Sequence, residues 1–280
     1  MIALIAGTGL LPAVLTEHLR SQAKPFTVCA LQGNLPTLSV DLSPRVFRLE
    51  HLGSLIADLH AEGVRSVCFA GAITRPQIDP TQIDARTRPL IEQIAGALRA
   101  GDDGALRVVL GVFEQHGFTV ASVQELMPSL VPSAGVLSQR KPDDQDGADA
   151  GRAAGVLAAM GRSDIGQSCV VSGGQVLALE ALPGTDWMLR SLAELPSHRI
   201  PAAGARGRGV FYKAPKPGQD RRADLPVIGP DTVQACARAG LRGLVIEEGG
   251  VIVLEKARVI EWADAEDLFV WVRPSEEAQP

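Results

Sequence analysis

Residues 2–12 read IALIAGTGLLP, and this stretch decides the fold of the first part of the chain. Its first five residues are an unbroken apolar run, which is typical of a strand in a parallel sheet. Apolar residues then recur at helical spacing from Leu10 to Ser21, with Pro12 in the first turn, where proline is tolerated. A strand that turns through glycine into a helix predicts an α/β domain. Because no basic segment or cleavage site accompanies the apolar run, we interpret it as a strand and not as a signal peptide.

The same alternation of β-rich runs and helical patterns continues to about residue 123, which predicts a parallel sheet flanked by helices. Further strands are expected at residues 26–31, 46–49, 67–70 and 119–123. Prolines and acidic residues between residues 128 and 147 then indicate a linker. We therefore expect a nucleotide-binding domain over residues 1–130, a linker over 131–147 and a C-terminal catalytic domain over 148–275.

Pairs of glycines predict hairpins in the second half of the chain, because a two-glycine turn between apolar runs favours that connection. Gly173-Gly174 separates residues 169–171 from 176–180, and Gly249-Gly250 separates residues 244–247 from 251–255. A helix is expected over residues 148–160, before the first hairpin. The C-terminal domain is therefore expected to be a mixed α/β domain with hairpins.

The composition of the 280-residue chain excludes several classes of protein. With 46% hydrophobic and 21% charged residues and no run of about 18 apolar residues, the chain is neither disordered nor built to span a membrane. A net charge of −5 argues against a general nucleic-acid binder. Widely spaced cysteines among apolar neighbours indicate buried thiols in a reducing cytosol: Cys29, Cys68, Cys169 and Cys236.

Several catalytic chemistries lack candidate residues in the sequence. No two of the five histidines stand at zinc-ligand spacing. There is no G-x-S-x-G elbow, Walker loop or candidate cysteine nucleophile either. Metal-assisted attack by water is the chemistry that remains to be expected.

The glycine turn after the first strand is a candidate phosphate site, because the N–H groups at a helix start bind anions. Its residues are Gly7, Thr8, Gly9 and Leu10. Two features disfavour a dinucleotide cofactor: Pro12 replaces the third glycine of G-x-G-x-x-G, and Gln32 stands where such enzymes carry an acid for the ribose. An NAD(P)-binding oxidoreductase remains an alternative, and the glycines also suit a turn without a ligand.

Other candidate ligand residues lie where expected strands end and helices begin. Gly71 and Thr74 follow the strand at residues 67–70, at the edge where open α/β sheets bind ligands, although Gly71 also suits a simple bend. The residues that open the helix after residue 100 fit metal binding, ribose binding or N-capping: Gly101, Asp102 and Asp103.

Thr185 and Asp186 are candidates of the same kind in the second half. Capping explains both, with Thr185 as N-cap and Asp186 as the acid of the first turn. Capping does not explain Glu180, which ends the first expected hairpin.

The segment from Arg199 to Arg222 is the most basic part of an acidic chain, with seven Lys or Arg residues and one acid. Lys213 and Lys216 lie in Lys-Ala-Pro-Lys-Pro, where two prolines stiffen the loop and reduce the entropy lost when cations bind a phosphate. Asp224 follows in a proline-containing turn, and its carboxylate suits a hard divalent cation or the orientation of a water. A mobile, solvated loop is the alternative interpretation.

Together these motifs resemble the LpxI-type UDP-2,3-diacylglucosamine pyrophosphatases over nearly the whole chain. The segments that carry the resemblance are residues 4–7, 11–12, 69–71, 101–103, 164–167, 184–186, 213–217, 224–226 and 228–229. Lys-Ala-Pro-Lys-Pro followed by Asp-Leu-Pro is the most specific combination among them.

The resemblance implies a Rossmann-like N-terminal domain, a distinct C-terminal domain and dependence on Mg²⁺. It implies that water attacks the α-phosphate of UDP-2,3-diacylglucosamine and yields UMP and 2,3-diacylglucosamine 1-phosphate (lipid X), a step of lipid A synthesis. Asp224 corresponds to the key aspartate of the family, which we expect to hold the metal or position the water. Lys213 and Lys216 are then the expected catalytic cations, and the glycine turn and the strand-end residues above are expected to bind the substrate.

The acyl chains of such a substrate favour aliphatic walls and a transient contact with the surface of the inner membrane, from a cytoplasmic location. The expected partner is this lipid-linked UDP-sugar and no nucleic acid. A non-catalytic sugar-nucleotide sensor that uses the same cationic loop is a second alternative. The sequence leaves the oligomeric state open, a homodimer included.

Overall fold

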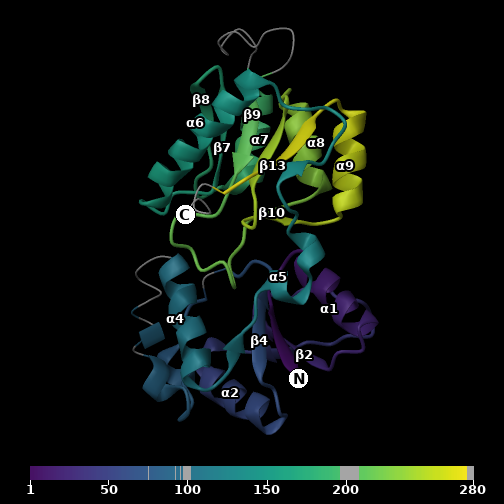
Figure 1. Cartoon of the computed structure of the whole chain (residues 1–280). Helices are drawn as coiled ribbons and strands as arrows, with labels where there is room; N and C mark the ends of the chain where they lie inside the picture. The colour runs from purple at the N-terminus through teal and green to yellow at the C-terminus, as the bar shows by residue number, and fades with distance from the viewer. Residues whose placement is uncertain (75, 92, 95, 97–101, 196–207, 276–280) are drawn as a thin grey trace. The chain divides into compact units, whose positions relative to one another are not determined.

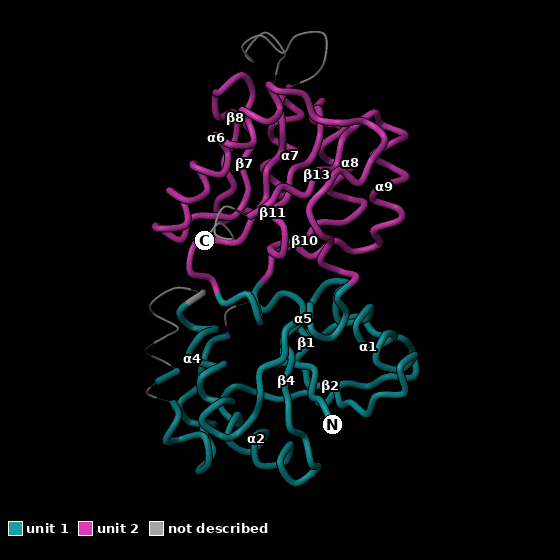
Figure 2. The backbone as a smooth tube through the Cα atoms, in the orientation of Figure 1, with its two compact units in different colours: residues 1–128, 220–224 teal, residues 129–219, 225–280 magenta. Residues whose placement is uncertain are grey.

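The computed structural model describes residues 1–74, 76–91, 93, 94, 96, 102–195 and 208–275, with the backbone alone at residues 102 and 103. The chain forms two compact units (Figure 2). Unit 1 comprises residues 1–128 and 220–224, and unit 2 comprises residues 129–219 and 225–280. The short second segment of unit 1 comes from the range expected for the C-terminal domain. Within the described ranges, no helix has both the length and the apolar character needed to cross a membrane.

Unit 1 is built on a five-stranded parallel sheet with the strand order β3-β2-β1-β4-β5. Its strands are β1 (Ile2–Ala6), β2 (Phe26–Leu31), β3 (Arg45–Phe47), β4 (Ser66–Ala70) and β5 (Thr119–Val120). β1 lies in the centre, where Ile2 pairs with Phe26 of β2 and with Ser66 of β4. This order is Rossmann-like, so the predicted α/β fold with a parallel sheet is confirmed. The order reverses between β1 and β4, and such sheets bind ligands outside the carboxyl ends at this point.

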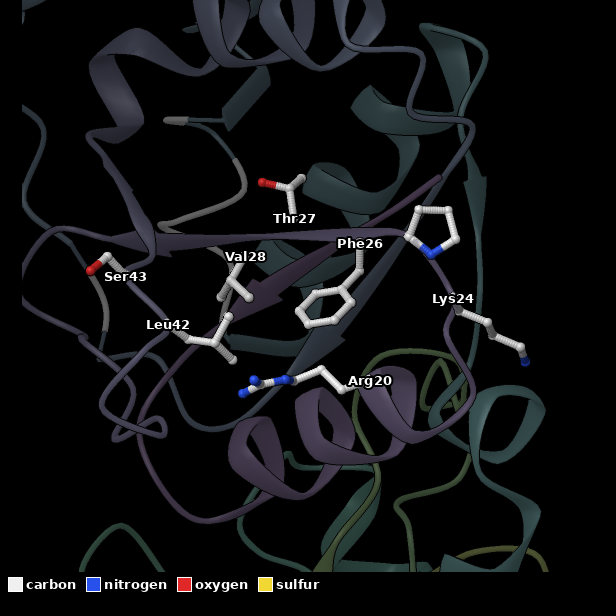
Figure 3. Close-up of a pocket in the computed structure, with 8 residues that line it drawn as sticks. Arg20, Lys24, Phe26, Thr27, Val28, Leu42 and Ser43 are labelled. Carbon is white, nitrogen blue, oxygen red and sulfur yellow. The ribbon is translucent and has the colours of Figure 1, made fainter.

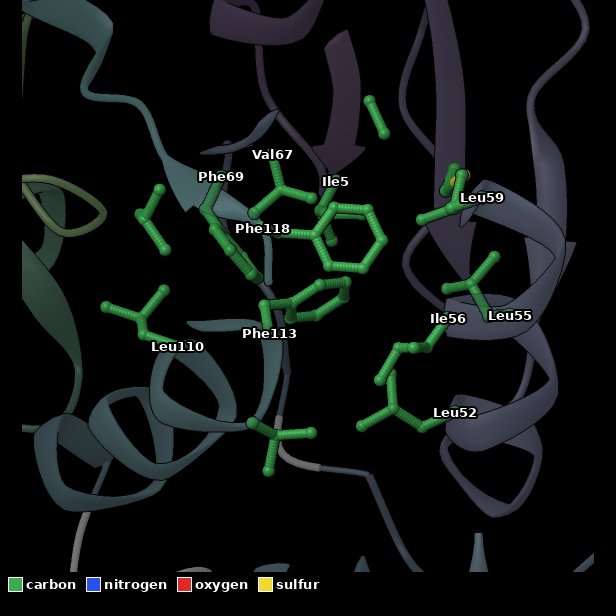
Figure 4. Packing of buried hydrophobic residues seen from close by; sticks show 14 of the residues in the cluster. Ile5, Leu52, Leu55, Ile56, Leu59, Val67, Phe69, Leu110, Phe113 and Phe118 are labelled. Carbon is green, nitrogen blue, oxygen red and sulfur yellow. The ribbon is translucent and has the colours of Figure 1, made fainter. Parts of the chain in front are cut away.

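Helices of unit 1 bury an apolar face against this sheet. They are α1 (Leu11–Ser21), α2 (Leu52–Ala61), α4 (Asp102–Gln115) and α5 (Val123–Leu126), with the 3₁₀ helices η1 (Leu49–His51), η2 (Pro80–Gln82) and η3 (Arg88–Leu90), and η4 (Pro128–Leu130) at the boundary of the units. Side chains of α2 and α4 pack in one cluster with Ile5 and Phe69 of the sheet (Figure 4). The ring of Phe113 meets those of Phe69 and Phe118 edge-on, with centroids 5.6 and 5.7 Å away. Edge-to-face pairs stabilise a core beyond the area they bury, so these rings add to the stability of the core that packs against the sheet.

Unit 2 contains a six-stranded mixed sheet with the strand order β6-β13-β11-β9-β7-β8. Its strands are β6 (Gly135–Val136), β7 (Ser168–Ser172), β8 (Gln175–Leu179), β9 (Val210–Lys213), β11 (Gly243–Glu247) and β13 (Phe269–Arg273), while β10 (Val227–Ile228) and β12 (Ile252–Val253) form a separate parallel pair. β9, β11 and β13 are parallel, whereas β6, β7 and β8 run antiparallel to their neighbours. The predicted mixed α/β architecture of the second half is confirmed.

Helices cover both faces of the sheet in unit 2. They are α6 (Asp144–Gly161), α7 (Gly184–Ala193), α8 (Pro230–Arg238) and α9 (Lys256–Ala265), all labelled in Figure 1. Val210 and Tyr212 of β9 pack with α6, and Phe211 packs with α7, α8 and α9 on the opposite face. Because side chains alternate along a strand, Lys213 at the end of β9 faces α7 and α8.

One of the two predicted hairpins is wrong. The hairpin at Gly173-Gly174 is confirmed as β7 and β8. The segment after Gly249-Gly250 does not fold back on β11, because β9 and β13 already occupy both edges of that strand. β12 pairs with β10 instead.

Two predicted boundaries shift because side chains cap helices earlier than expected. The strand expected at residues 119–123 ends at Val120, since Ser122 forms a capping box with Glu125 and starts α5. The helix expected from residue 148 begins at Asp144, because Asp143 and Asp146 form another capping box. Each box satisfies two backbone N–H groups at a helix start.

Candidate active site

The loops after β1 and β4 lie against each other at the carboxyl edge of the sheet in unit 1. Thr8 and Ala72 form an isolated antiparallel bridge: Thr8 N–H donates to Ala72 O over 2.8 Å, and Ala72 N–H donates to Thr8 O over 3.0 Å. The Thr8 hydroxyl donates to the same Ala72 oxygen over 3.1 Å. Gly7 N–H donates to Ala70 O over 2.8 Å. The structure therefore brings three of the predicted site residues together, namely Gly7, Thr8 and Gly71.

Two glycines allow this close approach. A Cβ atom on Gly7 would lie 2.3 Å from Ala72 O, and one on Gly71 would lie 2.5 Å from Thr8 O. Gly71 also has a φ of +92°, a conformation that strains residues with a side chain. The close approach of the two loops is the local reason for glycine at positions 7 and 71, and the backbone amides of Gly7 and Thr8 both donate hydrogen bonds there.

A third loop joins this edge through Asn34, a residue that sequence reasoning missed. Asn34 follows β2, its side chain is buried, and its Oδ1 accepts a hydrogen bond from Thr74 N–H over 2.6 Å. The loops after β2, β1 and β4 therefore stand together, and Gly9 and Leu10 of the predicted phosphate turn are exposed there. A glycine and an asparagine directly after a buried strand were the signal that could have identified this loop.

The third group of candidates in unit 1 is described only in part. Gly101 lies outside the described residues. Asp102 and Asp103 begin α4, and the structure describes their backbone alone. Their predicted part in ribose or metal binding stays a prediction.

Asp224 belongs to unit 1, in the segment 220–224. Asp224 N–H donates to Asp220 O over 3.1 Å, and Ala223 N–H donates to the same oxygen over 3.2 Å, which closes a tight turn. Ala223 packs against the core that contains Phe113. The Asp224 side chain is half-buried. A turn anchored in a core holds this carboxylate more precisely than a free loop would.

Arg222 attaches the same segment to α4. Its Nη1 donates to Glu114 Oε1 over 2.5 Å, and its Nε and Nη2 donate to the two carboxylate oxygens of Asp220 over 3.0 and 2.7 Å. The hydrogen bonds from Arg222 hold the pKa of the Asp220 carboxyl below its usual range. The sequence grouped Arg222 with cations for a phosphate, but two carboxylates engage its guanidinium in this structure.

Lys213 is a buried lysine at the carboxyl end of β9 in unit 2, with 7% of its surface exposed. Its Nζ donates to Thr185 Oγ1 over 2.9 Å, and the Thr185 hydroxyl donates to Glu180 Oε2 over 2.8 Å. Burial lowers the pKa of Lys213 from its ordinary value, while the negative charges of Glu180 and Asp186 act in the opposite direction. A cation held in low-dielectric surroundings attracts an anion more strongly than an exposed one does.

Thr185 does not cap α7 as predicted. Pro183 occupies the N-cap position, and no side-chain hydrogen bond caps the helix there. Thr185 lies within the first turn, and its hydroxyl joins Lys213 to Glu180 instead. Asp186 is the acidic residue of that turn, as expected.

Lys216 is held by a residue of another family motif. Its Nζ lies 2.5 Å from Asp164 Oδ1, and its backbone N–H donates to Gln219 Oε1 over 2.8 Å. Ala214 N–H donates to Gln167 O over 3.2 Å. The segments 164–167 and 213–217, which are distant in the sequence, therefore lie side by side in unit 2.

The candidates form two groups, one in each unit. Gly7, Thr8, Gly71 and Thr74 share the sheet edge of unit 1, and Asp224 belongs to the same unit. The second group surrounds β9 in unit 2 and contains Lys213, Lys216, Thr185 and Asp186. Hydrogen bonds connect the loops after β1, β2 and β4 in unit 1 and connect Lys213 with Thr185 in unit 2, whereas Asp224 shares only its unit with the first group.

The donor set fits a magnesium ion that binds together with a phosphate. Within the described ranges, no group of three or more His, Cys, Asp or Glu side chains could hold a metal by itself. Mg²⁺ usually takes one or two carboxylates and completes its shell with water and phosphate oxygens. A half-buried carboxylate such as Asp224 suits that mode of binding.

A pocket of about 430 Å³ in unit 1 lies away from the predicted site (Figure 3). It is lined by Phe26 and Val28 at the start of β2, whereas ligands of open sheets bind at the carboxyl ends of strands. Figure 3 shows Phe26, Val28 and Leu42 on one side of the strand and Thr27 pointing the other way. Arg20 at this pocket is paired with Asp41 at 2.5 Å. The pocket is therefore at the opposite end of β2 from the predicted site.

Family models match both halves of the chain. The model described as the LpxI N-terminal domain matches residues 1–130, and that described as the LpxI C-terminal domain matches residues 133–271. The chain belongs to the LpxI family. A curated LpxI, the UDP-2,3-diacylglucosamine pyrophosphatase LpxI of Caulobacter vibrioides, is 40% identical over 270 residues, 96% of this chain and 96% of the relative. The resemblance predicted from the motifs is confirmed.

Three of the motifs that carry the LpxI resemblance in the second half lie close together in unit 2. Segments 164–167, 184–186 and 213–217 meet around Lys213 and Lys216 through the hydrogen bonds above. Gly166 belongs to this contact, because a Cβ atom there would lie 2.3 Å from Glu180 O. These three motifs of LpxI therefore form one local arrangement and not separate turns.

Proposed function

We propose that the chain hydrolyses the diphosphate of UDP-2,3-diacylglucosamine to UMP and 2,3-diacylglucosamine 1-phosphate, in lipid A synthesis. The C. vibrioides relative carries the name of a UDP-2,3-diacylglucosamine pyrophosphatase and is similar over 96% of both chains. The observation that carries the proposal is the buried ammonium group of Lys213 at the end of β9, with Lys216 in the proline-containing loop that follows. Two fixed cations suit a ligand with two adjacent phosphates.

Each cation has a distinct part in the proposal. Lys213, fixed by Thr185, stabilises negative charge that develops on the phosphates as the bridge breaks. Lys216, oriented by Asp164, binds the diphosphate at the more open end of the loop. Exposed Gly9 and Leu10, with Gly71, Thr74 and Asp186, supply further substrate contacts.

Asp224 holds the metal or orients the attacking water. Its turn is anchored on unit 1 by Ala223 and Arg222, so the backbone that carries this carboxylate is held in place. Mg²⁺, when bound, neutralises phosphate charge and lowers the pKa of a bound water. The water attacks the α-phosphate, the proton passes to the medium or to the carboxylate, and 2,3-diacylglucosamine 1-phosphate leaves.

Incubation with UDP-2,3-diacylglucosamine and Mg²⁺, followed by separation of UMP, tests the proposal. Wild type is expected to release UMP, and Asp224→Asn is expected to lose about 10²-fold or more of the rate while it keeps its substrate affinity. Asp231→Asn is the matched control, because Asp231 is an exposed acid in the first turn of α8. Tight binding without UMP would indicate a sugar-nucleotide sensor and would contradict the proposal, as would full activity of Asp224→Asn.

We also propose a transient contact with an anionic membrane, which the two acyl chains of the substrate favour. Leu182 and Trp187 are 98% and 54% exposed, and they flank Thr185 at the start of α7. Exposed apolar and tryptophan side chains insert into membrane interfaces. In sedimentation with anionic vesicles at low salt, wild type is expected to pellet with the vesicles. The double variant Leu182→Asp/Trp187→Asp is expected to stay in the supernatant. Failure of wild type to sediment would contradict this contact.

A further inference from the structure

Glu180 is a buried carboxylate that the catalytic proposal does not use. It follows β8 directly, and 8% of its surface is exposed. Its backbone N–H donates to Ser168 O over 3.0 Å. The hydroxyls of Ser168 and Thr185 both donate to its Oε2. Burial of a carboxylate costs free energy unless hydrogen bonds or a nearby cation compensate for it, so the contacts of Glu180 are expected to matter to the fold or to the site.

The hydrogen bonds around Glu180 have one possible direction. The ammonium group of Lys213 only donates, a carboxylate only accepts, and a hydroxyl does both. Because Thr185 Oγ1 accepts from Lys213, its proton is directed at Glu180. The hydrogen bonds therefore run from Lys213 to Thr185 and from Thr185 to Glu180. The hydroxyl of Ser168 donates to the same Glu180 oxygen and helps to hold the carboxylate in place.

Among the described residues, two acids and one thiol face Lys213 from the elements packed against it. Glu180 approaches from the end of β8 and Asp186 from α7, and both favour the charged form of Lys213. Cys236 of α8 also faces it, but burial raises the pKa of that thiol, so the thiol is uncharged at neutral pH. Ser168 is the residue opposite Lys213 on β7. Glu180 is the acid among these groups that is also connected to Lys213 by hydrogen bonds.

We propose that Glu180 is a positioning residue: it holds the Thr185 hydroxyl, and through that hydroxyl it fixes the ammonium group of Lys213 for an anionic phosphate. The inference rests on the proposed function for the part played by phosphate. An ammonium has three donors, and Thr185 accepts one of them, which sets the directions of the other two. The negative charge of Glu180 also favours the charged form of Lys213 and so opposes the effect of burial, which lowers the pKa of this lysine.

Glu180→Gln tests this role, because it keeps the shape and removes the charge. Loss of the charge lowers the pKa of Lys213 further, so Lys213 loses its proton at a lower pH. The alkaline limb of the pH profile of kcat/KM is therefore expected to move down by about 1 pH unit or more. Glu194→Gln is the matched control, since Glu194 is an exposed acid that follows α7. Its profile is expected to match that of wild type.

A second readout does not depend on turnover. The sequence has five lysines, so the ¹³Cε signals of labelled lysine are few enough to assign with Lys213→Arg. The Lys213 signal is expected to titrate at a lower pH in Glu180→Gln than in wild type and to keep its wild-type titration in Glu194→Gln. Thr185→Val removes the acceptor for Lys213 but leaves the charge of Glu180, so it is expected to lower the pH at which Lys213 titrates by less than Glu180→Gln does. Thr185→Ser, which retains the hydroxyl, is expected to reverse the effect of Thr185→Val on this titration.

The outcomes separate this inference from the proposed function. An unchanged Lys213 titration in a folded Glu180→Gln overturns the positioning role, whatever the activity. A second outcome is that Lys213 titrates at a lower pH in Glu180→Gln than in wild type while the alkaline limb of the pH profile of kcat/KM stays where it is. That result overturns the link between phosphate and the hydrogen bonds that join Lys213, Thr185 and Glu180. If wild type releases no UMP, the proposed function fails, and the titration alone decides whether Glu180 controls Lys213. Parallel shifts in both measurements support the inference.

Discussion

Arg222 Nη1 lies 2.5 Å from Glu114 Oε1, an ion pair between residues 108 positions apart that ties the Asp224 turn to α4. Ala223 fills a place beside the core of unit 1 in the same turn. The chain before and after this turn belongs to unit 2. The turn that carries the carboxylate with the greatest expected part in catalysis is therefore held by unit 1, although the chain on both sides of this turn belongs to unit 2.

Arg222→Ala is expected to reduce activity much more than stability. The two side chains are 44% and 43% exposed, and exposed pairs contribute about 1 kcal/mol or less to folding. Release of the turn misplaces Asp224, and misplacement of a reacting group costs about 10- to 100-fold in rate. The measurement is kcat for UMP release, together with the midpoint of urea unfolding followed by circular dichroism.

Arg20→Ala is the matched control for that variant. Arg20 also forms an exposed pair with an acid of unit 1, Asp41, at 2.5 Å, but away from the Asp224 turn. Its kcat is expected to equal that of wild type. Equal loss of activity in both variants, or unchanged kcat in Arg222→Ala, would show that the ion pair does not position Asp224.

Gly71→Ala is expected to destabilise unit 1. Its Cβ atom would lie 2.5 Å from Thr8 O at a φ of +92°, and such strain costs about 1–3 kcal/mol. Gly111→Ala is the control, because Gly111 lies in α4 with nothing within 4 Å of the added atom. Alanine in a helix interior gains about 0.5–1 kcal/mol over glycine. Urea unfolding followed by circular dichroism measures both; Gly71→Ala as stable as wild type would refute the loop contact.

Lys213 is expected to make stability depend on pH on the alkaline side. Burial lowers its pKa in the folded chain, while the unfolded chain retains a value of about 10.4. Between these two values the unfolded chain binds more protons, so the free energy of unfolding of wild type gains a term that rises with pH. Lys213→Met lacks this term, so its stability relative to wild type is expected to fall as pH rises through the window.

Tryptophan fluorescence suits this measurement, because all three tryptophans lie in unit 2: Trp187, Trp262 and Trp271. Urea unfolding of wild type and Lys213→Met at several pH values from 7 to 10 gives the slope of the free energy of unfolding against pH for each protein. Identical slopes would mean that Lys213 has the same pKa in the folded and unfolded chain.

The cysteines are expected to be unreactive in the folded chain. All four are buried, and burial raises the pKa to about 11 for Cys29 and about 12 for Cys68 and Cys169, with Cys236 raised as well. The thiolate is the reactive form, and little of it exists at pH 8. A disulfide reagent is expected to label none of them in buffer and all four in denaturant. Rapid labelling of any cysteine without denaturant would contradict the burial described here.

The fold of unit 1 could be predicted because its signals are local. The apolar run at residues 2–6 and the helical spacing that follows depend only on nearby residues, and β1 and α1 form there. The Gly249-Gly250 hairpin failed for the opposite reason. Whether β11 accepts a partner depends on β9 and β13, which come from distant parts of the chain.

The candidate site shows the same division. Lys213, Lys216 and Asp224 were predicted from residue types and spacing, and the structure adds what holds each of them. Those contacts span large sequence separations, such as 28 residues from Lys213 to Thr185 and 52 from Lys216 to Asp164, and no local pattern encodes them. Capping rules even assigned Thr185 a different part, because they consider only its own helix.

The phosphorus atom that receives the oxygen of water distinguishes attack on the α-phosphate from attack on the phosphate attached to the sugar. Hydrolysis of UDP-2,3-diacylglucosamine in ¹⁸O-water, with both products analysed by mass spectrometry, reports which phosphorus is attacked. One ¹⁸O atom is expected in UMP and none in 2,3-diacylglucosamine 1-phosphate, and Asp224→Asn is expected to lose the incorporation of label. Label in the sugar phosphate, or unlabelled products, would contradict attack of water on the α-phosphate.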